Sequence, residues 1–183
     1  MALTATVFKA RLSVSDLDRP YYGDHDLVLA RHPSETDERM MLRLLAFALN
    51  ADEHLAFGRG LSNDDEPALW QKDLTGTVLH WIEVGLPDDR LLRRACGRSD
   101  RVTVYAYGRR AGTWWHGIRD AISRLDRLTV WQIDDDEAHR LLSFAERGMS
   151  LQCTVQDGTT WLSNEQQTIE ITPRCLTGHT GEK

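Results

Sequence analysis

The chain has 183 residues, of which 41% are hydrophobic, and it carries a formal net charge of −6. This size suits one domain with a substantial core, and no apolar run approaches the roughly 20 residues of a membrane helix. The amino-terminal residues lack a signal-peptide pattern, so we expect a cytoplasmic protein with no membrane partner. The three cysteines include no CxxC pair, which argues against a thiolate zinc site or a disulfide framework. Because the chain is acidic, nucleic-acid binding would require a local basic face.

Apolar periodicity and turn residues predict an α/β chain. In the first half of the chain we expect strands at 4–14 and 26–30, a helix at 35–49 capped by Ser34, a strand at 55–58, and a hairpin of strands 66–72 and 77–84. A helix at 87–97, a strand at 101–107, a helix at 111–125 and a strand at 128–133 follow. The last elements are a helix at 135–147 and strands at 151–155, 159–162 and 168–172. The short helix before strand 101–107 favours a parallel crossover and therefore a mixed sheet. We expect a single domain over residues 1–176 and a flexible tail at 177–183.

Acidic residues flank the predicted hairpin. If its turn covers residues 73–76, paired positions sum to 149 and Glu66 lies opposite Glu83. Two carboxylates about 5 Å apart at Cβ repel each other unless a proton or a cation lies between them. The pattern therefore predicts a divalent-metal site, with Mg²⁺ or Mn²⁺ as the ion. A bulge before Pro67 would turn Asp65 toward the metal in place of Glu66, and Asp64 belongs to the same run, so the choice among them stays open.

Each of these acids also has a structural interpretation without a metal. Charge runs usually face water, so Asp64, Asp65 and Glu66 could cap a solvated loop. Glu83 interrupts an apolar run just before a glycine, and it could be a strand-end charge that reaches solvent.

Three motifs spread along the chain together resemble the YaeQ family. They are Arg31-His32-Pro33-Ser34-Glu35-Thr36 through Arg43, Asp64-Asp65-Glu66-Pro67, and Trp81-Ile82-Glu83-Val84-Gly85-Leu86-Pro87-Asp88. The order of helix, short strand, two strands with acidic ends, helix and strand also resembles the PD-(D/E)XK nuclease core. The family resemblance runs from residue 2 to about residue 172. It implies a restriction-endonuclease-like fold, a central mixed sheet flanked by helices, with an extra N-terminal ribbon and C-terminal strands.

The nuclease resemblance implies roles for particular positions. An acid on one strand and a glutamate on the next bind magnesium, and a lysine two residues after the glutamate stabilises charge; Gly85 stands at that position here. In the resembling fold the first helix packs near the hairpin, so Glu38 would complete a shell of three carboxylates. The alternative for Glu38 is a solvated first turn that complements the helix dipole.

Arginines are the candidates for the missing cation. Arg93 and Arg94 on the second predicted helix, or Arg39 on the first, would face the carboxylates and hold phosphate, although arginine keeps its proton and cannot act as a base. Arg90, Arg94 and Arg98 share one face of the second helix and could form a phosphate track. A solvated face paired with nearby aspartates is the alternative.

The sequence supports two functional hypotheses. The first is a metal-dependent nuclease in which Glu83, Asp65, Glu66 and Glu38 bind Mg²⁺ or Mn²⁺, Arg94 assists the chemistry, and Arg93, Arg94 and Arg39 bind the polynucleotide. The second is a non-catalytic module that keeps the acidic pocket and interacts with nucleic acid or with another protein. The glycine at the lysine position and the acidic net charge favour the second hypothesis.

Overall fold

The computed structural model describes residues 4–59, 61 and 65–178. Its strands are β1 (Thr6–Asp16), β2 (Tyr21–Arg31), β3 (Leu55–Phe57), β4 (Leu69–Lys72), β5 (Val78–Val84), β6 (Ser99–Ala106), β7 (Leu128–Gln132), β8 (Gly148–Gln156), β9 (Thr159–Ser163), β10 (Thr168–Ile171) and β11 (Arg174–Cys175). Its helices are α1 (Asp37–Leu49), α2 (Asp89–Arg98), α3 (Ala111–Ile122) and α4 (Asp135–Arg140), which runs into the 3₁₀ turn η2 (Leu141–Phe144). Among these described helices, none has the length and apolar character needed to cross a bilayer.

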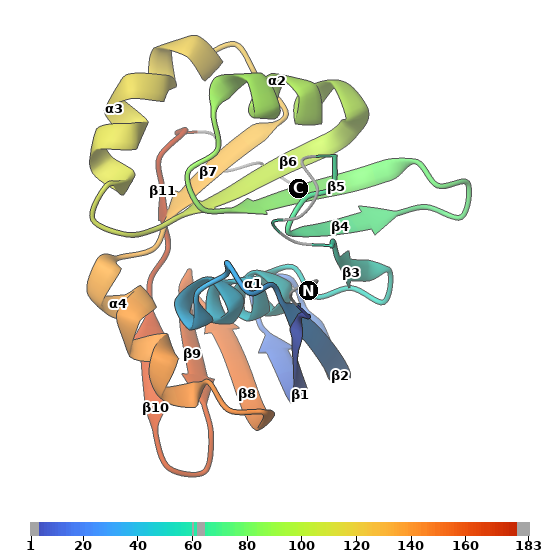
Figure 1. Ribbon diagram of the computed structural model, residues 1–183, viewed down its shortest axis with the longest axis vertical. Helices are drawn as coiled ribbons and strands as arrows, with labels where there is room; N and C mark the ends of the chain where they lie inside the picture. The colour runs from blue at the N-terminus through green and yellow to red at the C-terminus, as the bar shows by residue number, and fades with distance from the viewer. Residues whose placement is uncertain (1–3, 60, 62–64, 179–183) are drawn as a thin grey trace.

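The strands form two mixed sheets, whereas the sequence predicts one central sheet (Figure 1). One sheet has the order β11-β7-β6-β5-β4-β3, and the other has the order β10-β9-β8-β1-β2. The second sheet arises because β1 pairs in parallel with β8, with Leu12 opposite Leu151. The N-terminal ribbon and the C-terminal strands, predicted as separate additions, are therefore parts of one sheet. Neighbouring elements in a chain usually pair with each other, so local patterns could not indicate this long-range pairing.

Helix α1 lies between the two sheets and forms the centre of the main core (Figure 1). Every residue from Met40 to Ala48 is buried, as expected of a helix that contacts neighbours on all sides. Leu12 of β1 packs against it from one sheet, and Ile82 and Val84 of β5 pack against it from the other. The helix is thus positioned by both sheets at once.

A buried ion network holds the start of α1. Glu35 is only 1% exposed at its side chain, and it accepts hydrogen bonds of 2.7 Å from Arg43 Nε, Arg43 Nη2 and Arg39 Nη1. The buried Arg43 charge is therefore compensated inside the core. Thr36 caps the helix in place of the predicted Ser34, because its hydroxyl accepts a hydrogen bond from the backbone N–H of Arg39 at 3.1 Å.

Helices α2 and α3 cover the outer face of the six-stranded sheet (Figure 1). Leu92 of α2 and Ile118 of α3 belong to a second core cluster together with Trp81 of β5. Strands β5, β6 and β7 run parallel, as predicted for the strand that follows the second helix. Side chains alternate along β5, so Trp81 faces α2 and α3 whereas Ile82 faces α1.

The region after β7 differs from the prediction in two respects. The helix predicted at 135–147 ends at Arg140, and the chain then turns toward β8, where the N–H of Lys9 donates to the Arg147 carbonyl at 2.9 Å. Strand β11 was not predicted, and after it the N–H of Leu176 donates to the Val130 carbonyl at 2.8 Å. Residues 179–183 of the predicted flexible tail lie outside the described residues.

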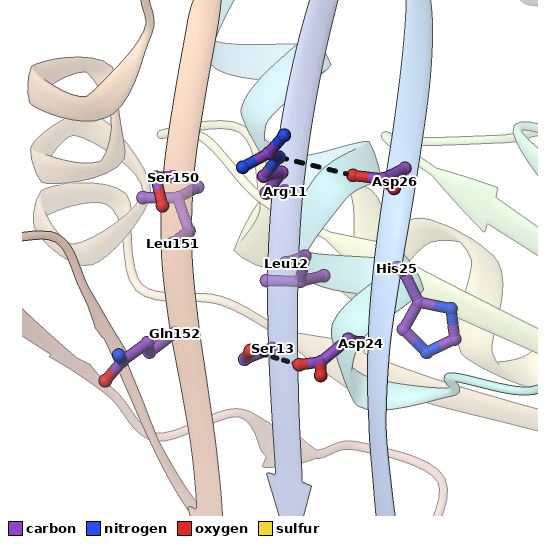
Figure 2. A pocket seen from close by; sticks show the side chains of 9 residues that line it. All are labelled: Arg11, Leu12, Ser13, Asp24, His25, Asp26, Ser150, Leu151 and Gln152. Atoms are coloured by element: carbon purple, nitrogen blue, oxygen red, sulfur yellow. Dashed lines mark hydrogen bonds and ion pairs between the residues drawn. The ribbon is translucent and has the colours of Figure 1, made fainter.

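The outer face of the five-stranded sheet carries polar side chains, and no described helix covers it (Figure 2). Arg11 of β1 lies 3.6 Å from Asp26 of β2, and these side chains are 86% and 89% exposed. The hydroxyl of Ser13 donates to Asp24 on the same face. Buried and exposed residues alternate along β1, which is typical of a sheet with one solvated face.

Candidate functional site

The acidic hairpin of β4 and β5 is present, but its predicted register is wrong. Trp70 pairs with Trp81, so paired positions sum to 151 instead of 149. The turn is longer than predicted because Asp73 Oδ1 accepts hydrogen bonds from the backbone N–H groups of Thr75 and Thr77, at 2.8 and 2.9 Å. A bulge near the end of β4 adds to the shift.

Glu66 consequently does not form a cross-strand pair with Glu83. Strand β4 begins only at Leu69, and Glu66 lies in the loop before it. Its Oε2 accepts a hydrogen bond from the N–H of Arg59 at 2.9 Å, and its Oε1 lies 3.5 Å from Arg59 Nε. The partner of Glu66 is therefore an arginine of its own loop.

Glu83 lies on the face of β5 that α2 covers, and it is only 9% exposed. Trp81, two residues earlier on the same face, donates its indole N–H to Glu83 Oε1 at 2.7 Å. A carboxylate that accepts a hydrogen bond in a nearly buried position is held in place. Glu83 is thus a well-oriented acid at the junction of the sheet and α2.

The structure brings the predicted site residues Asp65 and Arg94 together. Asp65 Oδ1 lies 3.8 Å from Arg94 Nη1 and 3.6 Å from Arg98 Nη1. Arg94 and Arg98 are one turn apart on α2, so both reach the loop that precedes β4. Asp65 is 69% exposed, and these ion pairs lie at the surface. Arginines of α2 therefore face one of the predicted acids.

Arg93 takes a different direction from Arg94. Its Nε lies 3.4 Å from Asp89 Oδ2 on the same helix, and its Nη2 donates to the carbonyl oxygen of Ala121. Arg93 therefore links α2 to α3.

Glu38 and Arg39 do not share a face with Glu83. They belong to α1, which packs on the side of β5 that bears Val84. Glu38 Oε1 lies 3.8 Å from His139 Nδ1 of α4, and Arg39 Nε donates to the Val84 carbonyl at 3.3 Å. Consecutive residues of a strand face opposite sides of the sheet, which is why Glu83 and Val84 meet different helices.

The backbone conformation favours a glycine at position 85, where the nuclease resemblance implies a lysine. Gly85 has a φ of +126°, in the region that favours glycine, and its N–H donates to the Tyr105 carbonyl at 3.0 Å. A Cβ at Gly85 would meet no atom within 4 Å, so space is not the constraint. A lysine would strain the chain where β5 ends.

His80 is the buried histidine of this sheet. Its Nε2 lies 2.8 Å from Thr103 Oγ1, and its Nδ1 accepts a hydrogen bond from Arg101 at 3.0 Å. Burial and the neighbouring Arg101 charge lower the pKa of His80 to about 3. The imidazole is therefore neutral near physiological pH.

Within residues 4–59, 61 and 65–178, no group of three or more histidines, cysteines and acids is placed to hold a metal ion. The third acid of the predicted run, Asp64, lies outside the described residues. Two of the predicted metal ligands, Glu83 and Asp65, lie on the α2 side of the sheet.

Comparison with known proteins identifies the relatives of this chain. A family model described as "YaeQ protein" matches residues 1–173. The chain belongs to the YaeQ family. It is 47% identical over 173 residues to "Uncharacterized protein YaeQ" of Escherichia coli (strain K12) and 49% identical over 173 residues to the protein of that name in Salmonella typhi. Each alignment covers 93% of this chain and 95% of the relative.

Two solved YaeQ structures have the same fold. The YaeQ protein from Xanthomonas axonopodis pv. citri aligns with a TM-score of 0.91 and 47% identity, over 94% of this chain and 98% of that one. The YaeQ protein from Pseudomonas syringae aligns with a TM-score of 0.91 and 40% identity, over 95% and 97% of the two chains. The two mixed sheets flanked by helices are therefore the YaeQ fold.

Charge is distributed very unevenly in this YaeQ-family protein. Residues 87–127 contain ten arginines, five aspartates and neither lysine nor glutamate, which gives a formal charge of +5. Because the whole chain has a charge of −6, the remainder carries −11. The sequence motifs pointed to the arginines of α2, but only the structure shows that α3 lies beside α2 and extends the same layer (Figure 1).

Proposed function

We propose that this protein binds nucleic acid through the arginine-rich layer, which we define as α2, α3 and the loops that flank them. The observation that carries the proposal is the charge of +5 on residues 87–127 of an otherwise acidic chain. Lys and Arg side chains that neutralise phosphates release counterions, and this release supplies much of the affinity for nucleic acid. Guanidinium groups also match phosphate oxygens in a bidentate geometry.

The contacts of the aspartates leave part of this layer available. Asp88 caps α2 by accepting a hydrogen bond from the Leu91 N–H at 2.8 Å, and Asp89 pairs with Arg93. Arg90 and Arg124 are exposed, and the described residues offer them no ion-pair partner within 4.0 Å. Arg90 on α2 and Arg124 in the turn after α3 are therefore positions of the layer where phosphate would be bound.

Neutralising the layer should weaken binding to short DNA and RNA oligonucleotides, single-stranded and duplex. For Arg90→Gln/Arg98→Gln we expect a lower affinity by fluorescence anisotropy and a slope of log K against log salt that is shallower by about two units, one for each lost phosphate contact. Lys9→Gln/Arg11→Gln removes the same charge from the outer face of the other sheet, on which Figure 2 shows Arg11, and should leave the slope unchanged. Equal losses in both variants would show that net charge alone governs binding and would refute the layer as the interface.

A second proposed function is metal-dependent phosphodiester hydrolysis at the Glu83 side of α2, in the manner of the PD-(D/E)XK nucleases that the sequence resembles. Glu83 and Asp65 both lie next to α2, and Arg94 contacts Asp65, so acids and a phosphate-binding cation adjoin the arginine-rich layer. A bound Mg²⁺ would lower the pKa of a water molecule and offset phosphate charge. Glu83 and Asp65 would hold the ion together with water, and Arg94 would bind the phosphate without acting as a base.

Metal-dependent cleavage can be tested directly with the same oligonucleotides. The oligonucleotides should be cut in Mg²⁺ or Mn²⁺ and spared in chelator, and Glu83→Gln should abolish cutting and weaken Mn²⁺ binding in calorimetry. Glu38→Gln is the matched control, because Glu38 lies on the α1 side of β5 and should retain both activities. Absence of cutting by the parent protein would reject hydrolysis and leave the binding proposal to its own test.

A further inference from the structure

A cleft opens between the two sheets beyond the end of α1, on the face of the six-stranded sheet opposite α2 and α3. It has a volume of about 220 Å³. Leu49, Trp131, Val155 and Pro173 give it mainly apolar walls that come from the helix end and from both sheets. This volume is several times that of a water molecule, roughly 30 Å³, and below the roughly 300 Å³ of the smallest drug-sized pockets.

Thr160 lines the cleft with a hydroxyl group that lacks a hydrogen-bond partner among the described residues. Its side chain is fully buried, at 0% exposure, and Oγ1 has no hydrogen-bond partner among the described residues. Buried hydroxyl groups in folded proteins are nearly always paired. The Thr160 hydroxyl is therefore a hydrogen-bonding group that a molecule bound in the cleft would satisfy.

Tyr105 provides a second hydroxyl in the same cleft. Its oxygen accepts a hydrogen bond from Asn50 Nδ2 at 2.8 Å, and the phenolic proton has no acceptor among the described residues. Burial raises the pKa of Tyr105 to about 12, so the hydroxyl remains a donor across the physiological range. The cleft thus presents two hydroxyls to an acceptor-bearing ligand.

The mouth of the cleft does not favour an anion. Arg19 is the cation there, but its Nε donates to the buried carboxylate of Asp16 at 2.6 Å. Asp18, also at the mouth, accepts hydrogen bonds from the N–H groups of Asp157 and Gly158. Two carboxylates beside one guanidinium leave no net positive charge, and an uncharged ligand fits better than an anion.

We propose that this cleft binds an uncharged planar heteroaromatic molecule of the size of one nucleobase. The apolar walls and Trp131 contact its ring faces, and the hydroxyls of Thr160 and Tyr105 meet its ring or carbonyl acceptors. The site does not depend on the nucleic-acid proposal, because Tyr105 and Trp131 pack with the α1 core whereas α2 and α3 pack with the outer core.

The test uses adenine and uracil as probes, with benzoate as an anionic counterpart, in ligand-observed NMR titrations of the intact protein. We expect saturable binding of adenine or uracil and weaker binding of benzoate. Thr160→Val should reduce the affinity two- to tenfold, which is the contribution of about one hydrogen bond. Because the Thr160 hydroxyl makes no bond in the free protein, this variant should fold like the parent.

Two further variants locate the binding. Tyr105→Phe should reduce the affinity by a similar factor, and Thr154→Val should leave it unchanged, because Thr154 is an outward-facing residue of β8. The proposal is overturned by any of three results: no saturable binding of either nucleobase, equal affinity in the parent and Thr160→Val, or benzoate binding as tightly as the bases.

Discussion

Glu35→Gln should lower the free energy of unfolding by about 3–5 kcal/mol, the usual cost of leaving a buried charge without its partner. Glu35 is the shared acceptor of Arg39 and Arg43, and both the Glu35 and Arg43 side chains are 1% exposed. Glutamine keeps the shape of the side chain but removes the negative charge. The buried Arg43 guanidinium then stays in the core without compensation. The loss in the free energy of unfolding is measured by urea or guanidinium chloride denaturation followed by circular dichroism.

Two variants separate burial from simple charge removal. Glu35→Gln/Arg43→Met removes the stranded guanidinium and should recover part of the lost stability, because methionine fills similar space without a charge. Asp26→Asn breaks the exposed Arg11–Asp26 pair on the outer sheet face and should have little measurable effect. If Glu35→Gln were as mild as Asp26→Asn, the network would not be the main support of the start of α1.

Gly58→Ala should destabilise the protein by about 3 kcal/mol, at the upper end of the usual cost of overpacking. A Cβ at Gly58 would lie 2.0 Å from the carbonyl oxygen of Pro67, so two backbone segments would have to move apart. The N–H of Gly58 also donates to the Ala68 carbonyl at 3.0 Å, and this bond would be strained. The displaced loop carries Asp65 and Glu66, so Mn²⁺ binding, if present in the parent, should fall as well.

Gly97→Ala is the matched control for Gly58→Ala. Gly97 lies in α2, and a Cβ there would meet no atom within 4 Å. Alanine has a higher helix propensity than glycine, so this variant should be neutral or more stable by up to about 1 kcal/mol. Thermal unfolding of the two variants should therefore shift in opposite directions. If both variants were less stable than the parent, the result would indicate that α2 itself does not tolerate alanine.

Much of the local structure was predictable because its signals are short-range. Pro87, Asp88 and Asp89 predict the start of α2, and the structure confirms Asp88 as its N-cap. The apolar periodicity of α1 predicts its end at Leu49, where the structure places it. Local sequence also predicts the parallel crossover from β5 to β6, which is observed. Each of these features depends on residues within a few positions of one another.

The candidate site was only partly predictable, since small local details decide it. The side chain of Asp73 draws Thr77 into the turn, and the resulting shift of the hairpin removes the predicted pairing of Glu66 with Glu83. The motif correctly singled out Glu83 as distinctive, but only the structure shows that Trp81 binds it. The contact of Asp65 with α2 likewise joins residues about thirty positions apart, and no periodicity indicates it.

The amino-acid order alone established most of the helices and strands, the family motifs and the arginine-rich segment, because propensity, capping and charge are properties of neighbouring residues. Folding decided the rest. The pairing of β1 with β8 made a second sheet, enclosed α1 on both sides and created the cleft near Tyr105 and Thr160. It also placed Glu38 and Glu83 on opposite faces of one sheet. These outcomes depend on contacts between segments that are distant in the chain, where burial of apolar surface determines which strands meet and which side of each strand faces the core.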